Sequence, residues 1–151
     1  MTNATAQQHV GTSAGRIRWG RIAIGAVLLE AVLIVAAIPL LGFVANPLAP
    51  GAQSPSGDYT IFFVSVAVAC FVVGVLAGWW VARPLSSQFM LHGALTGIVA
   101  TAIYLGICSI PPTTIVAVVA AYGPFWFFLA NGLRIIGATL GAGYRGRKRL
   151  A

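Results

Sequence analysis

The sequence predicts an all-α integral membrane protein, a transmembrane bundle of four helices in a single domain. Hydrophobic residues fill 59% of the 151 positions and charged residues only 7%, whereas about 25% of residues are charged in ordinary soluble domains. The mean hydropathy of +0.93 is too high for a surface that faces water. Four apolar stretches each reach the roughly 20 residues that a helix needs to cross about 30 Å of hydrocarbon.

These stretches are expected to be helices because a helix pairs its own backbone groups in lipid, and because the alternation typical of strands is missing. They cover Ile22–Val44, Tyr59–Ala82, Phe89–Ile110 and a last stretch that starts at Thr113 or Tyr122 and ends near Gly143. The two alternatives for the last start depend on Gly123-Pro124, which either kinks a long fourth helix or separates it from an interfacial segment. We expect the kink.

The distribution of basic residues predicts the orientation. Residues 1–15, rich in Thr, Ala, Gln and Ser, are expected to be a disordered cytoplasmic tail, followed by a transmembrane domain over residues 16–144 and a basic tail over residues 145–151. Every Lys and Arg except Arg134 then lies on one side of the membrane, and the opposite loops carry only Asp58. The positive-inside rule places both termini in the cytoplasm. Because topology explains most of the net charge of +7, no nucleic-acid partner is expected.

Glu30 and Arg134 are the two charged residues inside the apolar stretches. At 1.5 Å per residue, Glu30 lies roughly 14 Å from Arg21 and Arg134 roughly 15 Å from Tyr144, so both reach about the same depth. An isolated charge at that depth is costly. The sequence therefore predicts a buried Glu30–Arg134 ion pair, with the first and fourth helices as neighbours.

Small residues mark the faces expected to pack. Three helices contain a G-x-x-x-G pattern, at Gly74 and Gly78, at Gly93 and Gly97, and at Gly137 and Gly141. Such faces let backbones approach closely in membranes. We expect them to pack helices within one chain, and an oligomer interface is the alternative.

The sequence also suggests an internal repeat of two helical hairpins. At an offset of 63 residues, Phe63 aligns with Trp126, Ala67 with Ala130, Gly74 with Gly137 and Gly78 with Gly141. Helices rich in Ala and Gly also match by chance, so the repeat stays a hypothesis.

Few residues offer chemistry. His92 is expected to form an interhelical hydrogen bond, with a place in a proton relay as the alternative. Asn131 lies one turn from Arg134 and is expected to hydrogen-bond across the bundle. Cys70 and Cys108 lack neighbouring Cys or His motifs and are expected to be small buried side chains. No nucleophile–base set, phosphate-binding loop or metal-ligand cluster is present, so we expect no cofactor, no metal and no enzymatic activity.

Basic residues directly follow the last helix, at Arg145, Arg147, Lys148 and Arg149. They are expected to contact anionic lipid headgroups at the cytoplasmic face. The alternative is that these charges only fix the topology.

The run R-P-L-S-S-Q-F-M-L-H-G-A-L-T-G-I-V-A-T-A-I-Y-L-G over residues 83–106 resembles the middle of small bacterial four-helix membrane proteins of uncharacterised function. The resemblance covers about two helices. It implies a multi-pass protein of the bacterial inner membrane and assigns no catalytic residue.

Two functions remain open on these observations. The first is a non-enzymatic helical bundle with a structural or partner-binding role, acting alone, as a homo-oligomer or with a membrane partner subunit. The second is a small oligomeric transporter or channel that uses Glu30 as a proton- or cation-responsive site.

Overall fold

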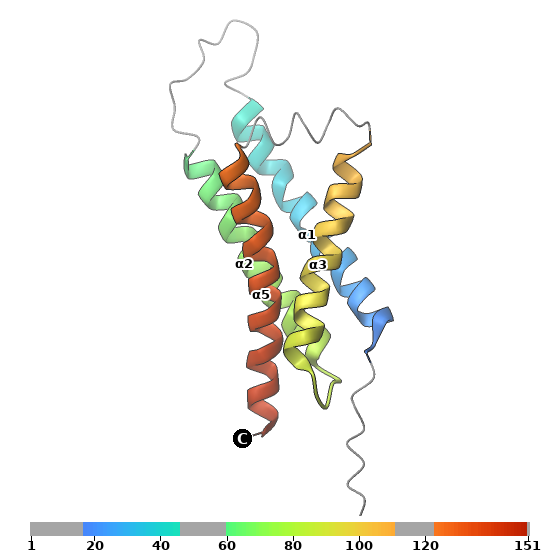
Figure 1. The fold of residues 1–151 in the computed structure, drawn as a ribbon. Coiled ribbons are helices and arrows are strands. Elements are labelled where there is room, and N and C mark those ends of the chain that lie inside the picture. The colour runs from blue at the N-terminus through green and yellow to red at the C-terminus, as the bar shows by residue number, and fades with distance from the viewer. Residues whose placement is uncertain (1–16, 46–59, 111–122, 151) are drawn as a thin grey trace, which may run out of the picture.

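A computed structural model describes residues 17–45, 60–110 and 123–150, and this part of the chain is all-helical. Its four helices are α1 (Trp19–Ala45), α2 (Thr60–Ala82), α3 (Phe89–Cys108) and α5 (Pro124–Leu150) (Figure 1). All four are long and apolar enough to cross a membrane. The prediction of an all-α chain with four such helices is confirmed. The predicted N-terminal tail and the loops after α1 and α3 lie outside the described residues.

The last helix starts after Gly123 and continues past its predicted end. Gly123 has a φ of +73°, a left-handed conformation, and α5 begins at Pro124. Residues 113–122, which the expected kink would join to this helix, lie outside the described residues. Proline suits the first position of the helix because its φ is already helical and its missing N–H would have no partner in the first turn. The helix then continues through the basic segment to Leu150, since Arg and Lys are good helix formers and favour the negative end of the helix dipole.

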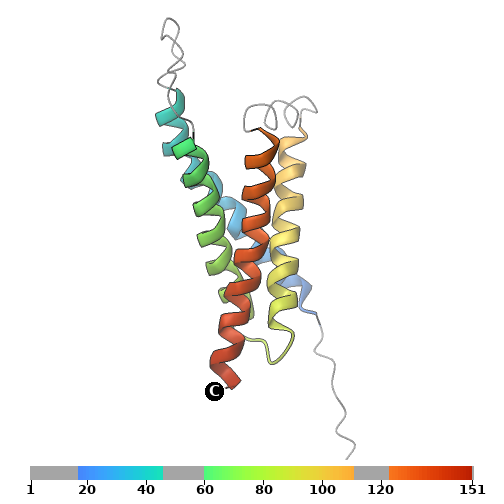
Figure 2. The same ribbon diagram turned by 60° about the vertical axis from the view of Figure 1, so that its left-hand side comes forward.

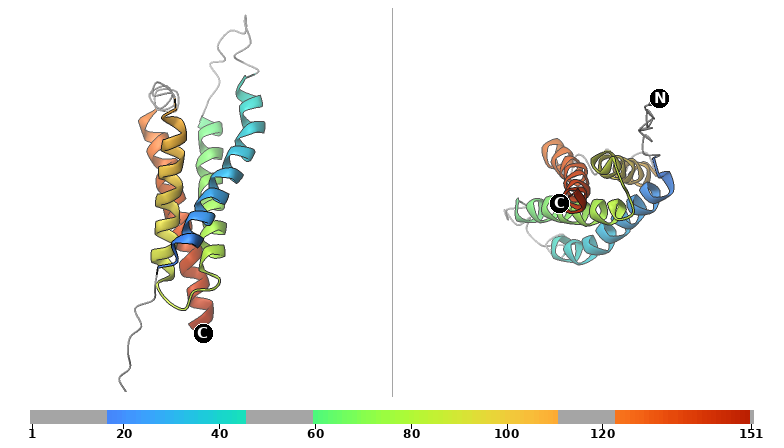
Figure 3. Two further views of the ribbon diagram at one scale, coloured as in Figure 1. Left: turned by 90° about the vertical axis from the view of Figure 1, so that its right-hand side faces the viewer. Right: turned by 90° about the horizontal axis from the view of Figure 1, so that it is seen from below.

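The helices alternate in direction, and α5 packs against α2 and α3 (Figures 1 and 2). Helix α1 crosses at a tilt on the other side of α2 and α3, away from α5 (Figure 3). The prediction that the first and last helices are neighbours is therefore wrong for their backbones. Glycine explains this arrangement of the helices. The glycines of α2, α3 and α5 allow α5 to pack closely against α2 and α3, whereas α1 has no G-x-x-x-G pair.

All six glycines of the G-x-x-x-G patterns lie at contacts between helices of this chain. A Cβ atom built on Gly74 would lie 2.7 Å from the Arg134 carbonyl oxygen, and one on Gly97 would lie 2.6 Å from the Ile135 Cα atom. At the other positions an added Cβ would also meet backbone, at Ala138 for Gly78 and Gly93, at Phe71 for Gly137 and at Val75 for Gly141. Any side chain at these positions would push the helices apart.

The contact between α2 and α5 is reciprocal. Gly78 on α2 faces the carbonyl of Ala138 on α5, and Gly141 on α5 faces the carbonyl of Val75 on α2. Exchanging the two helices at the offset of 63 residues turns the first contact into the second. The two helices run in the same direction, so this exchange corresponds to a local two-fold relation along their length.

The aromatic rings near the start of these helices follow the same relation. Phe63 on α2 and Trp126 on α5 are equivalent at that offset, and their rings stack with centroids 5.7 Å apart and an interplanar angle of 21°. Equivalent residues meet each other only where they lie close to a two-fold axis.

The outward surface of the helices is apolar. Val35, Leu76, Ile98 and Phe128 are each half exposed or more. Such a surface would be unfavourable in water and is matched by lipid chains.

Apart from the buried Arg134, the described basic residues gather where α1 and α3 begin and where α2 and α5 end, and we call this region the basic end. It comprises Arg18, Arg21, Arg83, Arg145, Arg147 and Lys148. Rings of Trp79, Trp80 and Tyr144 lie beneath several of these cations. Aromatic rings and cations together are typical of a membrane–water boundary.

Candidate functional site: the buried Glu30–Arg134 pair

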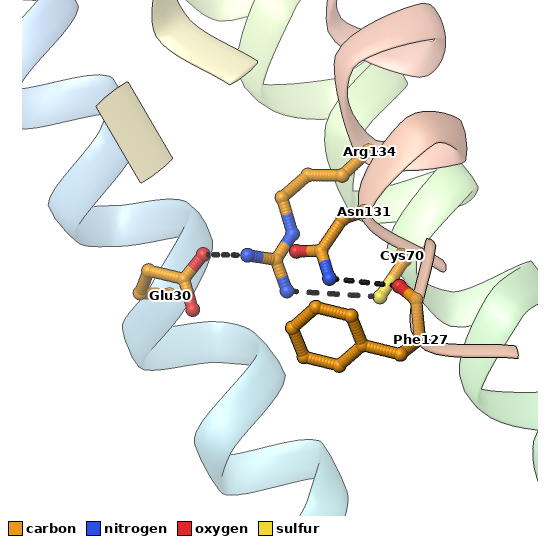
Figure 4. A network of polar contacts seen from close by, with 5 residues as sticks. All are labelled: Glu30, Cys70, Phe127, Asn131 and Arg134. Carbon is orange, nitrogen blue, oxygen red and sulfur yellow. Dashed lines mark hydrogen bonds and ion pairs between the residues drawn. The ribbon is translucent and has the colours of Figure 1, made fainter. Parts of the chain in front are cut away.

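Glu30 and Arg134, the two charged residues inside the apolar stretches, meet in the interior of the bundle. Arg134 donates from Nη1 to Glu30 Oε1 at 2.6 Å (Figure 4). Only 4% of Arg134 and 3% of Glu30 is exposed. The hydrogen bond is short, as expected of a pair in which both partners are charged.

The Arg134 side chain bridges helices that hardly touch. It leaves α5 and reaches Glu30 on α1 by passing over the ring of Tyr104 on α3, with the guanidinium carbon 5.1 Å from the ring centroid. Its Nη2 atom also lies 3.9 Å from Cys70 Sγ on α2. The guanidinium therefore contacts all three of the other helices, and Figure 4 shows it between α1 and the α2–α5 pair.

Local sequence explains why Arg134 points inward. Asn131, Ala138 and Gly141 lie on the same face of α5 as Arg134, at three- and four-residue spacing, and all are buried. Ile136 and Leu140 occupy the outward face, where each is half exposed. The small side chains bring α2 and α3 close, and the arginine stem extends along the space left between them.

Burial makes the pair sensitive to loss of one member. Removing both charges from water costs several kcal/mol per ion, and their attraction in a low-dielectric interior offsets much of this cost. Removing one partner leaves an uncompensated buried charge, which costs about 3–5 kcal/mol. Replacing both by apolar residues of similar volume is often neutral.

Two polar atoms in and beside the pair have no hydrogen-bond partner among the described residues. They are Arg134 Nε, a donor, and Asn131 Oδ1, an acceptor, and both are buried. Asn131 instead donates from Nδ2 to the Phe127 carbonyl oxygen at 2.8 Å, one turn earlier in the same helix. Contrary to the prediction, Asn131 makes no hydrogen bond across the bundle to another described residue, and one of its amide N–H groups binds the backbone carbonyl one turn earlier in its own helix.

His92 ties the start of α3 to the start of α1. It is almost fully buried. Its Nε2 accepts from the Arg18 backbone N–H at 3.2 Å, and its Nδ1 lies 2.9 Å from the Gln88 carbonyl oxygen. One nitrogen therefore accepts and the other donates, as in a neutral imidazole. Both ring nitrogens are engaged by backbone groups at the basic end, and none of these bonds leads to Glu30.

The basic residues after Gly143 form the last turns of α5. The guanidinium carbon of Arg145 lies 5.7 Å from the centroid of the Trp79 ring, and that of Arg83 lies 4.0 Å from the same ring. Lys148 lies 4.9 Å from the Tyr144 ring centroid. Arg147 is exposed, and the side chain of Arg149 lies outside the described residues.

Sequence reasoning missed two residues of the site, Cys70 and Tyr104. Cys70 lies on the small-residue face of α2, one turn before Gly74, and that spacing was a usable signal. Tyr104 lies one turn after Ala100 on the buried face of α3. Nothing in the sequence marked its ring as the surface under a guanidinium. Within the described residues, no group of three His, Cys, Asp or Glu side chains is placed to hold a metal ion.

Comparison with known proteins adds no relative. No protein-family model, no curated protein and no solved structure matches this chain. The resemblance of residues 83–106 to small bacterial membrane proteins stays a prediction.

Proposed function

We propose that this chain is a non-enzymatic membrane protein with a structural or partner-binding role, whose assembly depends on the Glu30–Arg134 pair. The observation that supports this most is the position of the pair between α1 and α5, two helices that scarcely contact each other. The pair joins α1 to the tightly packed α2, α3 and α5. A charge pair used in this way needs no substrate.

The proposal includes a bacterial inner membrane location with both termini in the cytoplasm, and an internal repeat of two hairpins. The basic end supports the orientation, because it holds every described basic residue except the buried Arg134. The reciprocal α2–α5 contact supports the repeat. A homo-oligomer or a membrane partner subunit would use the apolar outward faces, and anionic headgroups would contact Arg145, Arg147, Lys148 and Arg149.

A double-mutant cycle tests the structural role. Glu30→Leu and Arg134→Leu alone should each destabilise the folded protein by about 3–5 kcal/mol, and the double variant should recover most of that loss. Unfolding in mixed micelles measures both. Val27→Leu with Ile136→Leu, at exposed positions of the same two helices, is the matched control and should leave stability unchanged. Additive losses in the double variant would contradict the structural role.

A small oligomeric transporter or channel is the second candidate, and one observation favours it. Arg134 Nε in the pair and Asn131 Oδ1 beside it have no partner among the described residues, and water or a small polar ligand would satisfy both. Glu30 would then be the proton- or cation-responsive group. This function would be favoured if proteoliposomes with the native protein showed a proton or cation flux. The flux should then be absent with the Glu30→Leu, Arg134→Leu double variant even though its stability is restored. Absence of flux in the native protein would favour the structural role.

A further inference from the structure

An apolar groove opens on the outer surface between the first turn of α3 and the last turns of α5. Its volume is about 610 Å³. The lining residues are mostly apolar and include Met90, Leu91, Leu140 and Gly143, with Gln88 and Arg147 at the basic end. The groove therefore changes from apolar to polar along its length.

Glycine keeps this groove open. A side chain on Gly143 would meet the Met90 Cγ atom at 3.2 Å and take up the space between the helices. On α5 the lining positions Leu140, Gly143, Tyr144 and Arg147 follow one stripe at three- and four-residue spacing. Leu140 and Arg147 are then roughly 10 Å apart along the helix axis.

The polar mouth of the groove is strongly cationic. Arg147 makes no hydrogen bond, ion pair or ring contact with another described residue, in contrast to Arg83 and Arg145, which lie over Trp79. Lys148, over the Tyr144 ring, adds a second positive charge beside the mouth. Glu30 is the only acidic side chain in the described part of the chain, and it is buried elsewhere. An anion at the mouth would therefore meet no carboxylate.

We propose that the α3–α5 groove binds one anionic phospholipid, with an acyl chain against Leu91 and Leu140 and the phosphate at Arg147 and Gln88. A phospholipid has this order of apolar and anionic parts, and a free phosphate would leave the apolar part of the groove empty. This inference rests on the proposal that the helices span a bilayer. It is independent of the role of the Glu30–Arg134 pair, since none of the groove residues contacts that pair.

Native mass spectrometry of the full chain in mild detergent, titrated with phosphatidylglycerol or phosphatidylcholine, tests the site. Arg147→Gln should weaken phosphatidylglycerol binding about fivefold, which corresponds to about 1 kcal/mol for one basic residue near an anionic surface. Arg18→Gln removes the same charge at an exposed position outside the groove and should change binding less than twofold. Native protein should bind phosphatidylcholine more weakly than phosphatidylglycerol.

A second pair of variants tests the apolar part. Leu140→Trp should fill the groove and abolish the tightest phosphatidylglycerol site, whereas Ile136→Trp, one turn away and equally exposed, should not. All four positions are exposed, and unchanged helical circular dichroism would show that each variant folds. Equal losses for Arg147→Gln and Arg18→Gln would reduce the effect to general surface charge and overturn the proposal. Unchanged phosphatidylglycerol binding in Leu140→Trp would also overturn the proposal. A change in oligomeric state without a change in lipid binding would overturn it too, because the groove would then bind a second copy of the chain.

Discussion

Replacing Gly74 by Ala should separate α2 from α5. The added Cβ atom would lie 2.7 Å from the Arg134 carbonyl oxygen and 3.2 Å from the Ala138 nitrogen. Ordinary contact begins near 3.4 Å, so the backbones must move apart by roughly 0.7 Å, since neither neighbour is a flexible side chain. Overpacking of this kind costs about 1–3 kcal/mol.

The expected loss of stability in Gly74→Ala must be corrected for the higher helix propensity of alanine. Another glycine of the same chain, Gly132, provides the control. Alanine is better than glycine in a helix by up to about 1 kcal/mol. Gly132 lies on α5 with no heavy atom within 4 Å of a built Cβ, so Gly132→Ala should report the propensity gain alone. We expect Gly74→Ala to be less stable than Gly132→Ala by about 2 kcal/mol.

Reversible unfolding in mixed micelles of mild detergent and dodecyl sulfate, followed by tryptophan fluorescence, measures this difference. Gly141→Ala extends the test, because its Cβ would meet the Val75 carbonyl oxygen more closely than that of Gly74 meets Arg134. Gly141→Ala should therefore cost more than Gly74→Ala. If Gly74→Ala were as stable as Gly132→Ala, the α2–α5 contact would not hold the helices at the distance inferred here.

Two further substitutions test the start of α3. Gln88 has a φ of +54°, a conformation that costs a non-glycine residue about 1 kcal/mol. Gln88→Gly should therefore raise the free energy of unfolding by about 0.5–1 kcal/mol. Gln88→Ala is the control and should give no gain, and equal effects of the two substitutions would argue against backbone strain. His92→Leu removes the acceptor for the Arg18 N–H and should lower the free energy of unfolding by about 1–2 kcal/mol. Hydrogen exchange at the Arg18 amide should become faster. Unchanged exchange at this amide would show that the hydrogen bond does not form.

The sequence was sufficient to predict the number of helices and the glycines at which neighbouring helices approach most closely. Each apolar stretch is long enough to be recognised by itself, and glycine at four-residue spacing marks a face independently of its partner. Glu30 and Arg134 could be matched because depth along a helix follows from residue counting. The structure places these two side chains in contact.

The order of the helices around the bundle could not be read in the same way. A periodic pattern gives the face that a helix buries, but not which helix covers it. The length of the arginine side chain adds a second ambiguity, because its stem can follow an apolar surface and deliver the charge well away from its own helix. An ion pair across helices that do not pack together therefore looked, from sequence, like evidence of adjacency. The end of α5 was missed because hydropathy falls at Tyr144 while helix propensity does not.

The charged pair lies where the proposed repeat is broken. At the offset of 63 residues Arg134 corresponds to Phe71 and Glu30 to Gly93. Gly93 lets α3 approach the Ala138 backbone on α5, whereas the equivalent position of α1 carries Glu30, whose side chain binds Arg134. Close packing and ion pairing are then alternatives at one position, since the first requires no side chain and the second requires a long polar one. In this chain α3 uses the first and α1 the second. The stability of α1 should therefore depend on the two charges to a degree that the stability of α3 does not.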